Sequence, residues 1–248
     1  MNLKEILDEN YLEFSNENNL LNYADPLQIA RNLGDERAIL ICALFAYGNA
    51  KMIVKFLKSL DFSLLNSSEI LIKNELKFLK YRFENSADLI EIFITLRRFG
   101  LENNIEDLIL QGSKNGEIYL GIKNLVDKIY KLNPYRSFGY EFFFGKTFEN
   151  IPKSPLKRYN MFLRWMVRDK DIDLGKFKKI SKSALFLPLD THTHKVSLKL
   201  GLTNRKIYDF KAVIDITKKL QEFDPQDPIK YDFALYRLGQ SKKIENIL

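Results

Sequence analysis

Apolar residues recur at helical spacing along most of the chain, and this pattern restricts the fold more than any other feature. Leu3, Ile6 and Leu7 would share one helix face with Tyr11 and Phe14. Similar helical segments are found at 37–47, 51–60, 68–80, 87–99, 104–110, 117–131, 156–168, 191–200 and 209–223, and a last one opens at Asp227-Pro228. No convincing run of alternating apolar and polar residues indicates a strand. The sequence therefore predicts an all-α protein.

The segment 37–47 is apolar on nearly every side, which predicts a buried central helix. Asp35 is expected to be its N-cap, because a carboxylate accepts hydrogen bonds from the first free N–H groups of a helix. Cys42, the only cysteine, falls inside this helix, so no disulfide can form within the chain. We expect Cys42 to be a small buried side chain.

Composition and charge narrow the functional classes. The chain has 248 residues, of which 46% are hydrophobic and 29% charged, which excludes disordered and low-complexity classes. Lys and Arg outnumber Asp and Glu by 39 to 32. This excess indicates either an anionic partner such as nucleic acid or a solvated, lysine-rich surface. No apolar run approaches the roughly 18 residues of a membrane span, so we expect a cytoplasmic, nucleoid-associated protein without a membrane partner.

Two segments lack a helical pattern. Residues 133–155 are rich in aromatic and turn-forming residues, which predicts an irregular connection, with 140–144 filling the core. Asp169, Asp171 and Asp173 alternate like a metal-binding loop, but the Gly and Glu of an EF-hand do not follow. They are expected to form a solvated turn.

Asp190 stands between the apolar run LFLPL and the helical segment 191–200. This position predicts an N-cap whose carboxylate stays ionised, because it accepts backbone N–H bonds and faces the positive end of the helix dipole. A plain cap is the ordinary role of such an aspartate. An ionised acid beside a basic surface could also stabilise a developing cation or accept a proton.

Lys157 begins the basic segment 156–168. Lys157, Arg164 and Arg168 fall on one helix face, which is either a solvated surface or a surface that follows a phosphate backbone. The helix start, together with the nearby Lys153 and Arg158, could lower the pKa of the Lys157 amine. Lys157 would then be a usable nucleophile at neutral pH.

Three stretches carry a resemblance to the helix-hairpin-helix DNA glycosylases. PLDTHTHKVSLKLGL resembles the segment in which an apolar-Pro-apolar-Asp-Thr-His run places the catalytic aspartate at a helix N-terminus. YDFALYRLGQ is similar to the last helix of that family, and AILICALFAYGNAKMIVKFL to the helix-loop-helix that fills the gap left by an extruded base. The resemblance implies a two-lobed helical bundle with a cleft between lobes. Residues 34–172 would form a barrel-like lobe ending in an atypical hairpin and basic helix, and 1–33 with 173–248 the second lobe.

The family's usual Gly-x-Gly hairpin is absent before Asp190, and the interval from Lys157 to Asp190 is long. Both features resemble the archaeal type of 8-oxoguanine glycosylase, whose catalytic lysine begins a helix that bears a second lysine two turns later. Lys157 matches the first lysine and Arg164 the second. The resemblance implies base excision through a Schiff base at Lys157, followed by strand cleavage at the abasic site. Asp190 would stabilise the cationic sugar.

The same resemblance assigns further roles. Asp232 would accept the N7–H of 8-oxoguanine, Tyr236 would stack on the base, and Asn49 would enter the vacated space or bond the opposite base. The residues expected to contact DNA are Lys153, Arg158, Arg164, Arg168, His192 and Lys195. The expected partner is double-stranded DNA with a damaged base, bound by a monomer without a cofactor. His192 and His194 would point to different helix faces, so no shared metal is expected.

Two other interpretations remain open. The chain could be a glycosylase for another lesion, such as an alkylated base or an oxidised pyrimidine. It could instead be a non-catalytic helical protein that binds nucleic acid, in which Lys157 and Asp190 are structural.

Overall fold

The computed structural model of the protein describes residues 2–114 and 116–240, and throughout these residues its regular secondary structure is helical. The α-helices are α1 (Leu3–Phe14), α2 (Glu17–Leu21), α3 (Leu27–Ala30), α4 (Glu36–Leu44), α5 (Ala50–Lys58), α6 (Glu69–Leu76), α7 (Ser86–Glu102), α8 (Ile105–Gly112), α9 (Ile118–Leu132), α10 (Phe138–Phe144), α11 (Lys157–Val167), α12 (Thr191–Lys199), α13 (Phe210–Phe223) and α14 (Asp232–Gln240). Three 3₁₀ segments accompany them, η1 (Phe62–Asn66), η2 (Lys182–Ala184) and η3 (Pro228–Tyr231). In the described residues, β-type pairing is limited to two isolated bridges. The predicted all-α class is confirmed.

The chain forms two compact units, one of residues 24–148 and one of residues 1–23 with 149–248. The expected boundaries grouped α11 with residues 34–148, whereas α11 lies in the unit of 1–23 and 149–248. Nearly all of α11 is buried there. The segment after it is also tied to it, since the N–H of Leu174 donates to the carbonyl of Trp165 at 2.8 Å and that of Phe177 to Met166 at 2.7 Å.

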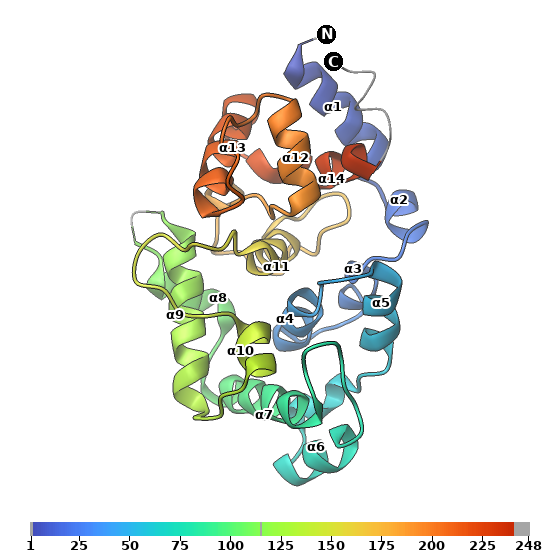
Figure 1. Cartoon of the computed structure of the whole chain (residues 1–248), viewed down its shortest axis with the longest axis vertical. Helices are drawn as coiled ribbons and strands as arrows, with labels where there is room; N and C mark the ends of the chain where they lie inside the picture. Colours follow the sequence, from blue (N-terminus) through green and yellow to red (C-terminus); the bar gives the residue numbers. More distant parts are fainter. Residues whose placement is uncertain (1, 115, 241–248) are drawn as a thin grey trace. The chain divides into compact units, whose positions relative to one another are not determined.

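The unit of residues 24–148 is built around α4. Every residue from Ala38 to Leu44 is buried, as predicted for a helix that is apolar on all sides. Asp35 is its N-cap and accepts the N–H of Arg37 at 2.8 Å. Cys42 is fully buried, and this burial raises the pKa of its thiol. Helix α3 packs on α4 and α5, α8 pairs with α9, and α7 contacts α6, α9 and α10 (Figure 1).

Helix α10 corrects the expectation of an irregular connection across 133–155. Ser137 caps it by accepting the N–H of Tyr140 at 3.0 Å. Tyr140, Phe143 and Phe144 are fully buried, which confirms that this aromatic run fills the core. Aromatic residues have modest helix propensity, so local preference did not indicate a helix that burial stabilises.

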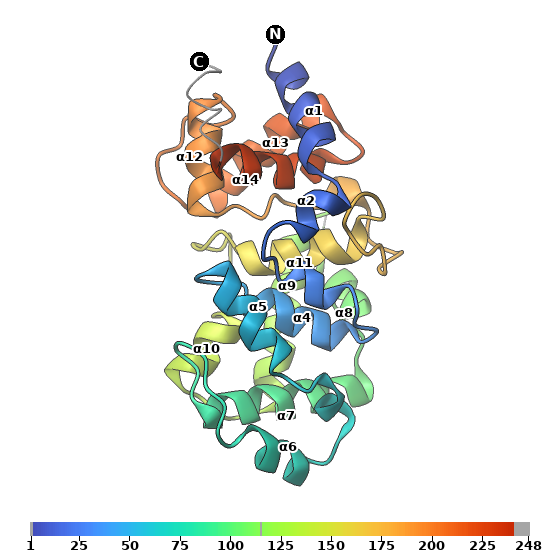
Figure 2. The ribbon, with the colours of Figure 1, turned by 90° about the vertical axis from the view of Figure 1, so that its right-hand side faces the viewer.

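In the other unit, α14 lies between α1 and α12 and contacts both (Figures 1 and 2). Gly239 allows α14 to approach α12 closely, because a Cβ at this position would lie 2.8 Å from Cγ2 of Val196. Helix α13 packs against η3. Within the part of the chain that is described, no helix has both the length and the apolar character required to cross a membrane.

Candidate active site

Lys157 is the first residue of α11. The preceding Leu156 adopts left-handed backbone angles (φ 52°, ψ 31°), and its side chain makes no capping hydrogen bond. Asn160 holds this turn, because its N–H donates to the Leu156 carbonyl at 2.9 Å and its Nδ2 to the Pro155 carbonyl at 3.1 Å. Lys157 is half-buried, and its Nζ lies 3.4 Å from Sδ of Met161. The fold thus places an amine at the start of a helix that is otherwise core.

Asp190 is the N-cap of α12, as the sequence predicted. Its Oδ1 accepts the N–H of Thr193 at 2.7 Å, and its carbonyl accepts the N–H of His194 at 2.8 Å. Tyr208 stabilises the chain just before this cap, since its hydroxyl donates to the Leu189 carbonyl at 2.8 Å. The His194 ring contacts Tyr208, and its Nε2 lies 2.9 Å from the carbonyl of Arg205. Asp190 itself is half-buried, and the N–H of Thr193 binds one of its two carboxylate oxygens.

Asp232, the first residue of α14, connects these two residues electrostatically. Burial raises the pKa of its carboxyl group, the charges of Arg164 and Lys157 lower it, and the charge of Asp190 raises it. Burial and the Asp190 charge also raise the pKa of Tyr208 to about 12. Lys157, Asp190 and Asp232 belong to the same unit, and α14, which begins at Asp232, packs against α12, which Asp190 caps.

Arg164 is buried rather than exposed. Its Nη1 binds Oδ2 of Asp232, and its Nε donates to Oδ1 of Asp173 at 3.1 Å. This corrects the expectation that Arg164 contacts DNA phosphates, because the face of α11 that bears it turns into the protein. The guanidinium stays charged: burial alone would lower its pKa, but the two carboxylates raise it.

Arg168 extends this buried network and corrects the same expectation for its own side chain. It binds Asp173, and its Nε and Nη2 donate to Asp227 at 2.9 and 3.0 Å. Asp171 accepts from Nη2 of Arg168 at 3.1 Å and from the Tyr11 hydroxyl at 2.8 Å. The Asp173 side chain is fully buried, so the expected solvated turn is wrong at this residue. The sequence does contain a signal for this network: two arginines four positions apart are followed closely by aspartates at every second position.

The remaining predicted residues are dispersed. Lys153, His192 and Lys195 are exposed, and Arg158 and Tyr236 are half-buried, all in the unit of 1–23 and 149–248. Asn49 belongs to the other unit, where it is exposed and caps α5. Its Oδ1 accepts the N–H groups of Lys51 and Met52 at 3.0 and 3.3 Å.

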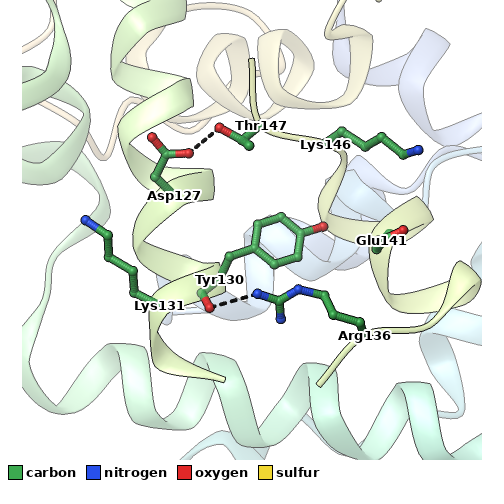
Figure 3. A pocket seen from close by; sticks show the side chains of 7 residues that line it. All are labelled: Asp127, Tyr130, Lys131, Arg136, Glu141, Lys146 and Thr147. Carbon is green, nitrogen blue, oxygen red and sulfur yellow. Dashed lines mark hydrogen bonds between the residues drawn. The ribbon is translucent and has the colours of Figure 1, made fainter. Parts of the chain in front are cut away.

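A hollow of about 480 Å³ lies in the unit of 24–148, between the end of α9 and the chain that follows it (Figure 3). The residues that line it are Asp127, Tyr130, Lys131, Arg136, Glu141, Lys146 and Thr147. The Arg136 guanidinium lies 4.5 Å from the Tyr130 ring centre and donates to the Tyr130 carbonyl at 3.1 Å, while Thr147 bonds Asp127. The lining therefore combines both signs of charge, and it includes none of the residues predicted to act in catalysis or binding.

Among residues 2–114 and 116–240, no three His, Cys, Asp or Glu side chains are grouped so that they could hold a metal ion.

The site thus belongs to a helical protein that holds a lysine at one helix start and a capping aspartate at another near a buried ion-pair network. A family model described as a protein of unknown function (DUF2400) matches residues 25–241, and the chain belongs to this family. No curated protein and no solved structure matches it.

Proposed function

We propose that this protein is a base-excision repair glycosylase that removes 8-oxoguanine through a Schiff base at Lys157 and then cleaves the abasic site. One arrangement carries the proposal: Arg164 joins α11, which begins at Lys157, to Asp232, and α14, which begins at Asp232, packs against α12, whose N-cap is Asp190. The Asp-Thr-His resemblance around Asp190 gives this arrangement its chemical interpretation.

The proposed reaction uses the amine of Lys157 as nucleophile. Nζ attacks C1′ of the damaged nucleotide, and the bond from C1′ to the base breaks as the base leaves with the electron pair and takes up a proton. Asp190 stabilises the positive charge that develops on the sugar and accepts a proton from the amine. Opening of the sugar ring gives the Schiff base, and loss of a C2′ proton then expels the 3′ phosphate.

In this proposal Asp232 recognises the lesion. A carboxylate has acceptor capacity beyond a single ion pair, so Arg164 can orient Asp232 while it accepts the N7–H that 8-oxoguanine has and guanine lacks. In this proposal Arg164 binds Asp232 and does not contact DNA. The exposed cations Lys153 and Lys195 are available for phosphates. Extrusion of the base from the duplex would cost a few kcal/mol, which such contacts offset.

A non-catalytic nucleic-acid-binding protein is the second candidate. The observation in its favour is that Asp190 already has a structural role, the hydrogen bond to the Thr193 N–H. A glycosylase with a different base preference is the third, because no residue other than Asp232 bears on the identity of the lesion.

Borohydride trapping on a duplex with one 8-oxoguanine tests the proposal. The wild type should form a covalent adduct that Lys157→Ala abolishes. Lys176→Ala is the matched control, because it removes an exposed lysine of the same unit that has no proposed role, and it should keep the adduct. An adduct that survives Lys157→Ala, or none with the wild type, overturns the assignment. Duplexes with alkylated bases or oxidised pyrimidines identify another specificity, and salt-sensitive binding without any adduct favours the non-catalytic protein.

A further inference from the structure

The unit of 24–148 carries a partly exposed group of aromatic rings, here called the aromatic platform, made of Tyr47, Phe83, Phe138 and Phe142. Phe138 is 70% and Phe83 43% exposed. The Phe83 ring centre lies 4.7 Å from that of Phe142, 5.7 Å from that of Phe138 and 6.1 Å from that of Tyr47. Phe83 and Tyr47 are nearly parallel, at 11°. Side chains of this size are usually buried, so their joint exposure marks an interaction surface.

Arg82 adds a positive charge to the platform. Its guanidinium lies 5.7 Å from the Tyr47 ring centre and 5.5 Å from that of Phe83. It also packs against Gly48, where a Cβ would clash with Nη1 of Arg82. The Arg82 backbone is left-handed (φ 49°), a conformation that is strained for an L-residue. Contacts with the two rings and with Gly48 thus hold the exposed Arg82 guanidinium beside the platform.

The platform continues along the segment 77–83, KFLKYRF, which joins α6 to α7 and lies beside α10 (Figures 1 and 2). Phe78 is 85% exposed, and Nζ of Lys77 lies 5.1 Å from its ring centre. Lys80 is exposed as well. Cations and aromatic rings therefore alternate over this surface.

Two acidic groups next to the platform, Glu84 and Asp88, are buried, while Glu141 on α10 is half-buried. Glu84 accepts the hydroxyl of Tyr47, and Asp88 accepts the hydroxyls of Tyr135 and Ser137. Both carboxylates are almost completely shielded from solvent. The charges that the segment 77–83 exposes are positive, so the surface favours a polyanion.

We propose that the aromatic platform and the segment 77–83 bind unpaired nucleotides of single-stranded DNA. Every base has a π-face that can stack on an aromatic ring, and these faces are accessible only when the base is unpaired. The cations would bind the phosphates that separate successive bases. A polyanion with flat apolar faces matches both features of the surface, whereas an apolar partner would leave the cations without counter-charges. This inference goes beyond the proposed base excision and does not involve Lys157 or Asp190.

Fluorescence anisotropy with the full chain and an undamaged oligothymidylate of about 12 nucleotides, within the usual site sizes, tests the proposal. The double variant Phe83→Leu/Phe138→Leu keeps apolar side chains but removes two stacking rings, and it should raise Kd by about 10-fold or more. Arg82→Gln should weaken binding and reduce the salt slope by about 0.7, the contribution of one phosphate contact. Leu101→Ala, at another exposed apolar residue, and Lys131→Gln, at an exposed lysine on α9, are the matched controls and should bind like the wild type.

Stacking itself can be measured with 2-aminopurine in the oligonucleotide. Its fluorescence should fall on binding to the wild type, and the double variant should lose this quenching while circular dichroism shows that it is folded. The proposal is overturned if the wild type does not bind, or if the double variant binds and quenches as the wild type does. Concentration-dependent dimerisation that the double variant abolishes, without oligonucleotide binding, would assign the platform to a second copy of the chain instead. Because the oligonucleotide carries no lesion, its binding does not depend on base excision, so failure here is distinguishable from failure of the borohydride test.

Discussion

Arg164 and Asp232 form an ion pair inside the unit of 1–23 and 149–248, and the same guanidinium donates to Asp173 at 3.1 Å. The pair joins α11, which begins at Lys157, to the first residue of α14. Arg164 therefore determines how the proposed nucleophile and the proposed base acceptor lie relative to each other. Its side chain is only 6% exposed, so solvent does not weaken these contacts.

The first prediction concerns the energy of this pair. Arg164→Met should lower the free energy of unfolding by about 3–5 kcal/mol, because it leaves the buried Asp232 carboxylate without its ion-pair partner and removes one of the two arginines that bind Asp173. Lys219→Met is the control: it breaks an exposed ion pair with Glu222 and should change stability by less than about 1 kcal/mol. Urea unfolding at neutral pH measures both. Equal losses in the two variants would contradict a structural role for the Arg164 network.

The second prediction concerns the left-handed backbone of Leu156. Leu156→Gly and Leu156→Ala both remove the side chain, but only glycine adopts this conformation without strain. Leu156→Gly should therefore be more stable than Leu156→Ala by about 1 kcal/mol, the reverse of their order at an ordinary position. Urea unfolding of the two variants checks this order, and an alanine variant as stable as the glycine variant would show that the turn is unstrained.

Local features of the sequence were sufficient to predict most of the helices, though not α10, and several of their caps. The all-apolar segment around Cys42 predicted the buried α4, and the position of Asp190 before 191–200 predicted its capping bond to Thr193. Both predictions need only residues that are close in sequence. The first uses the periodicity of the side chains, and the second uses the free N–H groups of the first helical turn.

The direction in which a polar helix face points could not be predicted in the same way. The spacing of Arg164 and Arg168 shows that they share a face, but not whether it meets solvent or protein. The direction of this face depends on Asp227 and Asp232, which are distant in sequence and contact α11 only in the folded protein. The group of exposed rings around Phe83 was missed for the same reason, since Tyr47, Phe83 and Phe138 come from three separate segments.

The third prediction concerns pH and Tyr208. Its hydroxyl bonds the Leu189 carbonyl, so Tyr208→Phe should cost about 1 kcal/mol at neutral pH. Its folded pKa of about 12 exceeds the usual value of about 10, so the stabilisation is complete below pH 10 and is lost as the pH rises toward 12. Urea unfolding of both proteins between pH 8 and pH 11.5 should therefore show a difference that shrinks above pH 10. A constant difference would contradict the raised pKa.

The fourth prediction separates the two roles of Asp190. Asn is as good an N-cap as Asp, so Asp190→Asn should change the free energy of unfolding by less than about 0.5 kcal/mol, whereas Asp190→Ala should cost about 1 kcal/mol. Both variants lose the charge. If Asp190 stabilises the cationic sugar and accepts the proton of the Lys157 amine, both should trap the 8-oxoguanine duplex about 10²- to 10⁴-fold more slowly than the wild type. An Asp190→Asn variant that is folded and traps at the wild-type rate would show that the carboxylate is only a helix cap. Slow trapping by a fully stable Asp190→Asn would instead assign the charge of Asp190 to the chemistry, since capping and stability would be unchanged.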